Sequence, residues 1–139
     1  MMKSYELIDH TADVGLRAFG KNLEGLFRNA ACGMFEMMTD LKKVAVTFER
    51  SVHLEEKDVE DLFIRWLQEL LYRFSVDRAF YREFQFKGLT EKKLSAVIRG
   101  EKMDEKKHVF KKEVKAVTYH GLKVEKTEQG WVGEVIFDI

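Results

Sequence analysis

Residues 22–38 read NLEGLFRNAACGMFEMM, and this stretch decides the class of fold. Its apolar residues recur at spacings of three and four for more than four turns, which predicts an amphipathic helix from Leu23 to Met38. Asn22 is suited to cap the N-terminus of this helix. Gly25 and Gly33 each lower helix propensity by about 1 kcal/mol relative to Ala. We therefore expect these two glycines to permit close packing.

A second stretch, residues 58–74, reads DVEDLFIRWLQELLYRF and repeats the helical pattern. It predicts a helix over 59–74 with Asp58 as its N-cap. Strands are indicated by alternating apolar and polar residues in several other segments. These segments are 5–8, 14–19, 44–54, 80–86, 94–98, 114–119, 122–126 and 131–137. Arg50 and Arg82 interrupt the apolar faces of two of them, and the charged residues 101–107 indicate a mobile loop.

The order of these elements differs from the strict strand–helix alternation of a parallel sheet. It favours an α+β fold in which two helices pack on a mostly antiparallel β-sheet sandwich. A length of 139 residues, without repeats or flexible linkers, predicts one domain over residues 1–139.

The composition excludes several classes of protein. Lys and Arg total 24 and Asp and Glu total 24, so the chain lacks the basic surplus of a protein that binds mainly phosphates. The single cysteine, Cys32, excludes an internal disulfide and a cysteine-rich zinc site, and its helical position favours a buried, inert thiol. No apolar run approaches the ~20 residues of a membrane span, and no export signal begins the chain. We expect a cytoplasmic protein without a membrane partner.

The densest polar cluster is Asp9-His10-Thr11-Ala12-Asp13. Two carboxylates and an imidazole on a tight turn suit a divalent cation, because Ca²⁺ and Mg²⁺ prefer oxygen ligands and imidazole suits Zn²⁺. The alternative is that the aspartates form Asx turns and that His10 is a surface residue.

The C-terminal residues 135–139 read VIFDI and end within a strand-like run. Asp138 and the carboxylate of Ile139 therefore lie side by side on an ordered element. Together with Asp13 they would offer three or more anionic oxygens to one cation, if the two ends of the chain meet. The alternative is an edge strand that ends in water.

Other residues carry weaker signals for chemistry. The chain has no phosphate-binding glycine loop, no G-x-S-x-G elbow and no histidine pair at helical spacing. His53 and His108 have no partner in the sequence, and His120 lies in a turn-like segment. The lysine pairs at 106–107 and 111–112 favour a solvated loop over an RNA-binding or acid-binding patch. The sequence thus lacks the motifs that a self-sufficient enzyme would use for catalysis.

Four motifs resemble those of the archease family, in the same order and over essentially the whole chain. They are IDHTADVGL at 8–16, the helix containing AACGMF at 30–35, EVKAVTYHG at 113–121, and Gly130-Trp131 followed by VIFDI at 135–139. The resemblance implies a non-enzymatic activator of the RtcB-type RNA ligase of tRNA splicing. Such an activator promotes guanylylation of the ligase by GTP and permits multiple turnovers. The resemblance implies that it binds the ligase, that it can contact the GTP bound there, and that it acts on tRNA only indirectly.

The resemblance also implies a divalent cation, with Ca²⁺ expected and Mg²⁺ or Mn²⁺ as alternatives. Its ligands would be Asp13, Asp138 and the terminal carboxylate of Ile139. Asp9 and His10 would surround these ligands, and Lys115 would contact the partner or the nucleotide.

Two other functions remain open at this point. One is a chaperone-like modulator of RNA-modifying enzymes such as tRNA methyltransferases. The other is a small metal-dependent hydrolase that uses Asp13 and Asp138 with a histidine as base.

Overall fold

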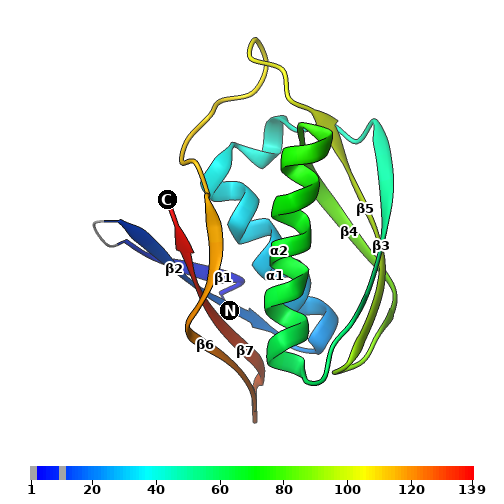
Figure 1. The fold of residues 1–139 in the computed structure, drawn as a ribbon, viewed down its shortest axis with the longest axis vertical. Helices are drawn as coiled ribbons and strands as arrows, with labels where there is room; N and C mark the ends of the chain where they lie inside the picture. Colours follow the sequence, from blue (N-terminus) through cyan, green and yellow to red (C-terminus); the bar gives the residue numbers. More distant parts are fainter. Residues whose placement is uncertain (1–2, 10–11) are drawn as a thin grey trace.

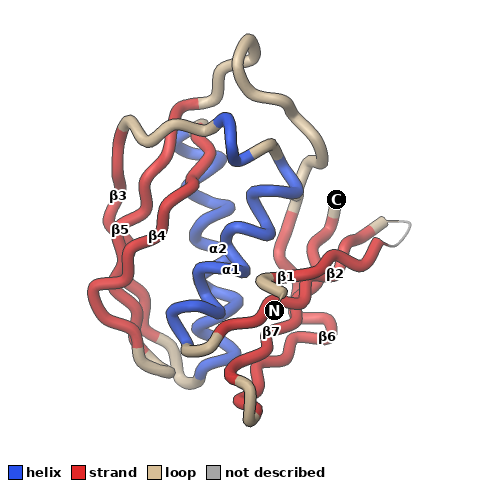
Figure 2. Tube along the Cα trace, turned by 180° about the vertical axis from the view of Figure 1, so that it is seen from behind, coloured by secondary structure: helices blue, strands red, loops and turns tan. Residues whose placement is uncertain are grey.

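The computed structural model describes residues 3–9 and 12–139 and arranges them in three layers. Two helices form the middle layer, between a four-stranded sheet and a three-stranded sheet (Figure 1, and from behind in Figure 2). All strand pairs within both sheets are antiparallel. The predicted α+β fold, with two helices packed on antiparallel sheets, is therefore confirmed.

The two helices are α1 (Leu23–Met38) and α2 (Val59–Asp77). The bounds of α1 agree with the prediction, whereas α2 continues past Phe74. It ends at Asp77, and the following residue, Arg78, caps it in a left-handed conformation with φ of 51°. Glycine is the residue that usually marks this kind of helix end, and Arg78 is not a glycine, so the local pattern did not predict where α2 ends. Neither helix has the combination of length and hydropathy that would let it cross a membrane, within the described residues.

Both predicted caps are present. The side-chain oxygen of Asn22 accepts a hydrogen bond from the backbone N–H of Gly25 at 2.8 Å. The carboxylate of Asp58 accepts one from the N–H of Asp61, also at 2.8 Å. Each cap satisfies an N–H group that the first helical turn leaves without an intrahelical partner.

The four-stranded sheet contains the first and the last strand of the chain. Its strand order is β1 (Tyr5–Asp9), β2 (Asp13–Gly20), β7 (Gly130–Asp138) and β6 (Ala116–Thr127). The sequence predicted two strands where β6 is one. An irregularity between Thr118 and Lys123 includes Gly121 with φ of 64°, so the backbone departs from regular pairing without ending the strand.

The three-stranded sheet has the order β3 (Phe48–Glu55), β5 (Lys93–Lys102) and β4 (Ala79–Leu89). The predicted strand over 44–54 is wrong at its start, because residues 44–47, between a short 3-10 helix, η1 (Leu41–Lys43), and β3, are not part of a strand.

Arg82 interrupts the apolar alternation of β4 because it lies at a bulge. The register with β5 shifts between Tyr81 and Glu83, which leaves Arg82 without a partner on β5. The extra residue turns its side chain away from the core, and its guanidinium donates a hydrogen bond to the carbonyl of Val44 at 2.8 Å.

The core lies between the two sheets, around the apolar stripes of the helices. Trp66 of α2 is fully buried, and its indole N–H donates to the carbonyl of Phe27 in α1 at 2.9 Å. A Cβ on Gly33 would lie 2.8 Å from a methyl of Leu16 and 3.1 Å from the ring of Tyr5. Gly33 thus lets α1 pack closely on β1 and β2, as predicted. Burial of each large apolar side chain contributes roughly 1.5–3 kcal/mol.

Candidate metal centre

The structure brings Asp13 and Asp138 together. Asp13 is the first residue of β2, Asp138 is the last residue of β7, and the two are direct partners in the antiparallel register. Directly opposed residues extend their side chains on the same face of a sheet, with Cα atoms roughly 4.5–5.5 Å apart. The alternate residues Val14 and Leu16 are buried against the helices, so the two aspartates occupy the outer face.

One carboxylate oxygen of Asp13 is buried and has no hydrogen-bond partner among residues 3–9 and 12–139. A buried polar atom without a partner is rare and costs roughly 1–3 kcal/mol. A second carboxylate directly opposite increases this cost, because like charges across a strand pair destabilise each other. A divalent cation reverses the local electrostatics and takes oxygen ligands, so the donor set at this end of the sheet fits such an ion.

The nearest cation on the outer face of β2 is already engaged. The guanidinium of Arg17 donates to Glu134 at 2.6 Å and to Glu6 at 2.9 Å. This triad lies further along the sheet from the aspartate pair. Neither Asp13 nor Asp138 makes an ion pair in the part of the chain that the structure describes.

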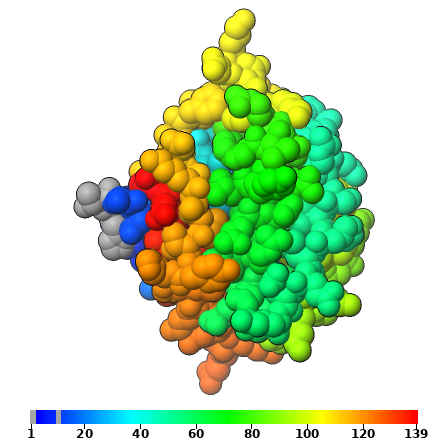
Figure 3. Space-filling view, viewed as in Figure 1, coloured from blue at the N-terminus to red at the C-terminus, as the bar shows by residue number. Residues whose placement is uncertain are grey.

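Ile139 is held beside this pair. Its backbone N–H lies 3.4 Å from the carbonyl oxygen of Ala12, and its partly buried side chain packs against the core. Lys115 is exposed, and its backbone N–H donates to the carbonyl of Asp138 at 2.8 Å. Figure 3 shows the red C-terminal residues directly against the blue strands near the N-terminus. Three of the residues that the resemblance indicated, together with Lys115, therefore lie at one end of the four-stranded sheet.

The other two candidates differ. Asp9 pairs with Val14, so the register places its side chain on the helix-facing side of the hairpin, opposite to that of Asp13. His10 lies outside the described residues. In residues 3–9 and 12–139, no three side chains of His, Cys, Asp or Glu are grouped as metal ligands. Any third ligand to the aspartate pair must come from another kind of group, such as the terminal carboxylate, or from outside those ranges.

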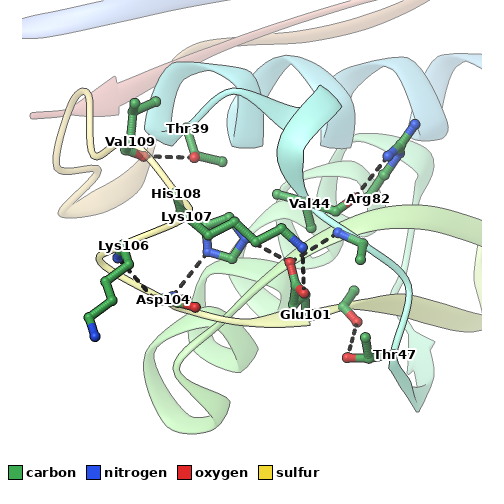
Figure 4. Close-up of polar contacts among 12 residues, drawn as sticks. Thr39, Val44, Thr47, Arg82, Glu101, Asp104, Lys106, Lys107, His108 and Val109 are labelled. Carbon is green, nitrogen blue, oxygen red and sulfur yellow. Dashed lines mark hydrogen bonds and ion pairs between the residues drawn. The ribbon is translucent and has the colours of Figure 1, made fainter.

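A second polar cluster, which the sequence did not predict, surrounds Glu101 (Figure 4). His108 is buried, and its Nε2 lies 2.8 Å from a carboxylate oxygen of Glu101. The backbone N–H of Asp104 donates to Nδ1 of the imidazole at 3.0 Å. Nδ1 therefore carries no proton, and Nε2–H donates to Glu101, so the imidazole is neutral with both nitrogens satisfied.

Two further groups bind the same carboxylate. Lys107 Nζ donates to Glu101 at 2.8 Å, and the backbone N–H of Ala45 donates at 3.1 Å. The hydrogen bond from Lys107, with those from Ala45 and His108, lowers the pKa of Glu101 to about 2. The prediction of a loop over 101–107 is thus wrong at its start, because Glu101 and Lys102 belong to β5.

The segment after this cluster is attached to the C-terminal end of α1. The hydroxyl of Thr39 donates to the carbonyl of Val109 at 2.7 Å. The backbone N–H groups of Lys111 and Lys112 donate to the carbonyls of Met38 and Met37 at 2.9 and 3.1 Å. These bonds satisfy carbonyls that the last helical turn leaves free. They also fix the chain that leads to Lys115, beside the aspartate pair.

Cys32 is half-buried on α1. Burial raises the pKa of its thiol, with a smaller opposing effect from Arg28. A thiol with a raised pKa forms little thiolate at neutral pH and reacts slowly. This supports the interpretation of an inert cysteine.

Comparison with known proteins identifies the relatives of this chain. A sequence model of the Archease protein family matches residues 5–139. The protein archease of Methanosarcina barkeri is 43% identical over 141 aligned residues, which cover 99% of this chain and 97% of that protein. The protein archease of Pyrococcus abyssi is 40% identical and covers 99% of this chain and 100% of its own. The chain belongs to the archease family.

Two solved structures resemble this archease fold. The solution structure of protein 1598 of Methanobacterium thermoautotrophicum has a TM-score of 0.83 and 34% identity, covering 99% of this chain and 100% of that chain. The crystal structure of a Thermotoga maritima archease, described as a possible chaperone, has a TM-score of 0.69 and 24% identity, with 100% and 98% covered. The second likeness concerns the fold alone.

Proposed function

We propose that this archease activates an RtcB-type RNA ligase of tRNA splicing through a divalent-cation site at the end of its four-stranded sheet. The observation that carries the proposal is the cross-strand pair of Asp13 and Asp138, with a buried carboxylate oxygen of Asp13 that has no partner in the described part of the chain. Family membership supports the same partner and the same activity. The protein acts as an accessory and does not itself join RNA.

In this proposal Asp13, Asp138 and the carboxylate of Ile139 hold the cation, with Ca²⁺ expected and Mg²⁺ or Mn²⁺ as alternatives. The cation supplies positive charge that neutralises phosphate oxygens of the nucleotide during guanylylation of the ligase. Asp138 is exposed, so the site remains open on one side to another protein. Lys115, exposed and bonded through its backbone to Asp138, contacts the ligase or its bound GTP.

The test measures ligation of RNA halves in large excess over a purified RtcB-type ligase, with GTP and a divalent metal. We expect the wild-type protein to increase the product per ligase and the fraction of guanylylated ligase. Asp13→Asn and Asp138→Asn should remove this stimulation. Glu91→Gln, which removes an exposed carboxylate at the turn between β4 and β5, is the matched control and should stimulate fully. Full stimulation by both aspartate variants would overturn the proposal.

A second variant addresses the terminal carboxylate. One glycine added after Ile139 converts that carboxylate into an amide and leaves all side chains unchanged. We expect weaker cation binding in calorimetry and a higher concentration of protein for half-maximal stimulation. An unchanged affinity would remove Ile139 from the ligand set.

The exposed apolar side chains of the four-stranded sheet favour a second function. Ile8 and Tyr119 are 42% and 62% exposed. Ile8 and Ile136 also line a cavity of about 150 Å³ on the outer face. Such surface suits a chaperone-like role towards RNA-modifying enzymes such as tRNA methyltransferases. That role does not require the aspartate pair, so Asp138→Asn should still suppress aggregation of a methyltransferase in light scattering. Loss of suppression by Ile8→Ser alone would support it.

A further inference from the structure

A cavity of about 330 Å³ lies between α1 and the edge strand β4, away from the aspartate pair. Its wall consists of Arg28 and Cys32 of α1, residues 82–85 of β4, and Arg99 of β5. Figure 2 shows β4 as the strand of its sheet beside the helices. Three guanidinium groups therefore line one hollow, in a chain whose acidic and basic residues are equal in number.

The positive charge of this cavity is only partly neutralised. Glu83 is the one carboxylate among its lining residues, and Arg99 donates to Glu49 at 3.2 Å. Arg28 and Arg82 make no ion pair with any residue that the structure describes. They are held instead by neutral acceptors, which leave their charge intact.

Backbone contacts fix these two guanidinium groups in advance. Nε of Arg28 donates to the carbonyl of Phe84 at 3.2 Å, and its guanidinium lies 5.4 Å from the ring centre of Phe86. Arg82 is turned outward by the bulge in β4 and donates to the carbonyl of Val44 at 2.8 Å. Each guanidinium has five N–H donors, so most remain available to a ligand.

We propose that this arginine cavity binds a phosphate group. The planar fork of a guanidinium matches two oxygens of a phosphate, and a phosphate offers enough oxygens to engage more than one fork. The cavity has room for a phosphate with part of the group that carries it. The same chemistry occurs in a free nucleotide and in the backbone of single-stranded RNA, and the experiment separates these two sources.

The experiment uses calorimetry with two probes: GTP without added metal, and a single-stranded ten-nucleotide oligouridylate. Arg28→Gln with Arg82→Gln should weaken binding about tenfold or more. A matched control, Arg65→Gln with Lys126→Gln, removes two positive charges elsewhere and should leave binding nearly unchanged. If GTP alone binds, the source is a nucleotide. If the oligouridylate binds more tightly, with an affinity that falls as KCl is added, the source is RNA backbone.

Glu83→Gln gives a readout that misfolding does not imitate. It removes the carboxylate that opposes an anion in the cavity, so we expect tighter binding of the same probe by severalfold. In the wild-type protein, amide NMR shifts on titration should concentrate at Cys32 and Gln85. The proposal is overturned if neither probe binds, if the shifts lie elsewhere, or if the arginine pair and the control weaken binding equally.

Discussion

Asp13 and Asp138 are direct cross-strand partners, so the first residue of β2 and the last residue of β7 place two carboxylates side by side on the outer face of the sheet. The cost of this arrangement can be measured without a ligase. In a chelator, Asp138→Asn should raise the free energy of unfolding by about 0.2–1 kcal/mol, because it removes like charges directly opposite each other. Urea denaturation at neutral pH measures this difference.

Calcium should make the wild-type protein more stable than Asp138→Asn, the reverse of their order in a chelator. A ligand that binds only the folded state stabilises it by about 2.7 kcal/mol at a concentration one hundred times its Kd. The wild-type Tm should therefore rise by several degrees on addition of CaCl₂, as measured by calorimetry. The Tm of Asp138→Asn should stay within about one degree of its value in chelator. An equal rise for both proteins would place the cation somewhere other than beside Asp138.

Glu101→Gln should destabilise the fold by about 1–3 kcal/mol at pH 7, because it removes a charged acceptor shared by Lys107 and the imidazole of His108. The effect depends on pH in a defined direction. The pKa of Glu101 is lowered from 4.5 to about 2, so its carboxylate contributes stability above about pH 4.5 and loses it as the pH falls towards 2.

Urea denaturation of the wild type and Glu101→Gln across this range checks the prediction. The difference in unfolding free energy should be greatest above pH 5 and should shrink as the pH falls below 4.5. Glu91→Gln, which removes an exposed carboxylate, is the control: it measures how much the loss of one negative charge changes the unfolding free energy without any specific contact. A difference between wild type and Glu101→Gln that stays constant down to pH 2 would contradict the assignment.

Arg50 interrupts the apolar face of β3 because it has a buried partner. Its Nε lies 3.4 Å from a carboxylate oxygen of Asp77, which is 9% exposed at the end of α2 and also accepts a hydrogen bond from Tyr81. Arg50→Met should cost about 1–3 kcal/mol, since it leaves a nearly buried carboxylate with fewer partners. In an Asp77→Asn background the same change should cost much less. Equal costs in the two backgrounds, measured by urea unfolding, would exclude this coupling.

These residues show what local pattern predicts and where it stops. Helical spacing and alternation predicted both helices and the inward faces of most strands, because each depends on neighbours within a few residues. The partners of Arg50 and His108 lie on other elements, so the spacing of residues within one segment cannot predict these contacts. Arg82 is a different case. The extra residue at the bulge in β4 shifts the alternation, so that the residues after it face the opposite side from the one that simple alternation predicts.

The candidate metal centre was predictable only in part. The cluster at residues 9–13 and the acidic end of the chain each suggested a cation, but their meeting depends on β2 pairing with β7. Alternation within each strand also decides which acidic residues share a face. It places Asp138 on the same face as Asp13 and Asp9 on the opposite face. The presence of several acidic residues at 9–13 does not by itself predict which of them share a face.

Gly133 allows both helices to approach β7, the strand that carries Asp138. A Cβ at this position would lie 2.8 Å from the ring of Phe63 and 3.2 Å from a methyl of Leu26, and both side chains are fully buried. Gly133→Ala should therefore destabilise the protein by about 1–3 kcal/mol through overpacking. Gly88→Ala is the matched control, because the same substitution in β4 meets no atom within 4 Å. Its effect should stay within about 0.5 kcal/mol. Urea denaturation decides the point: similar midpoints for the two variants would mean that the helices can withdraw from β7 at little cost.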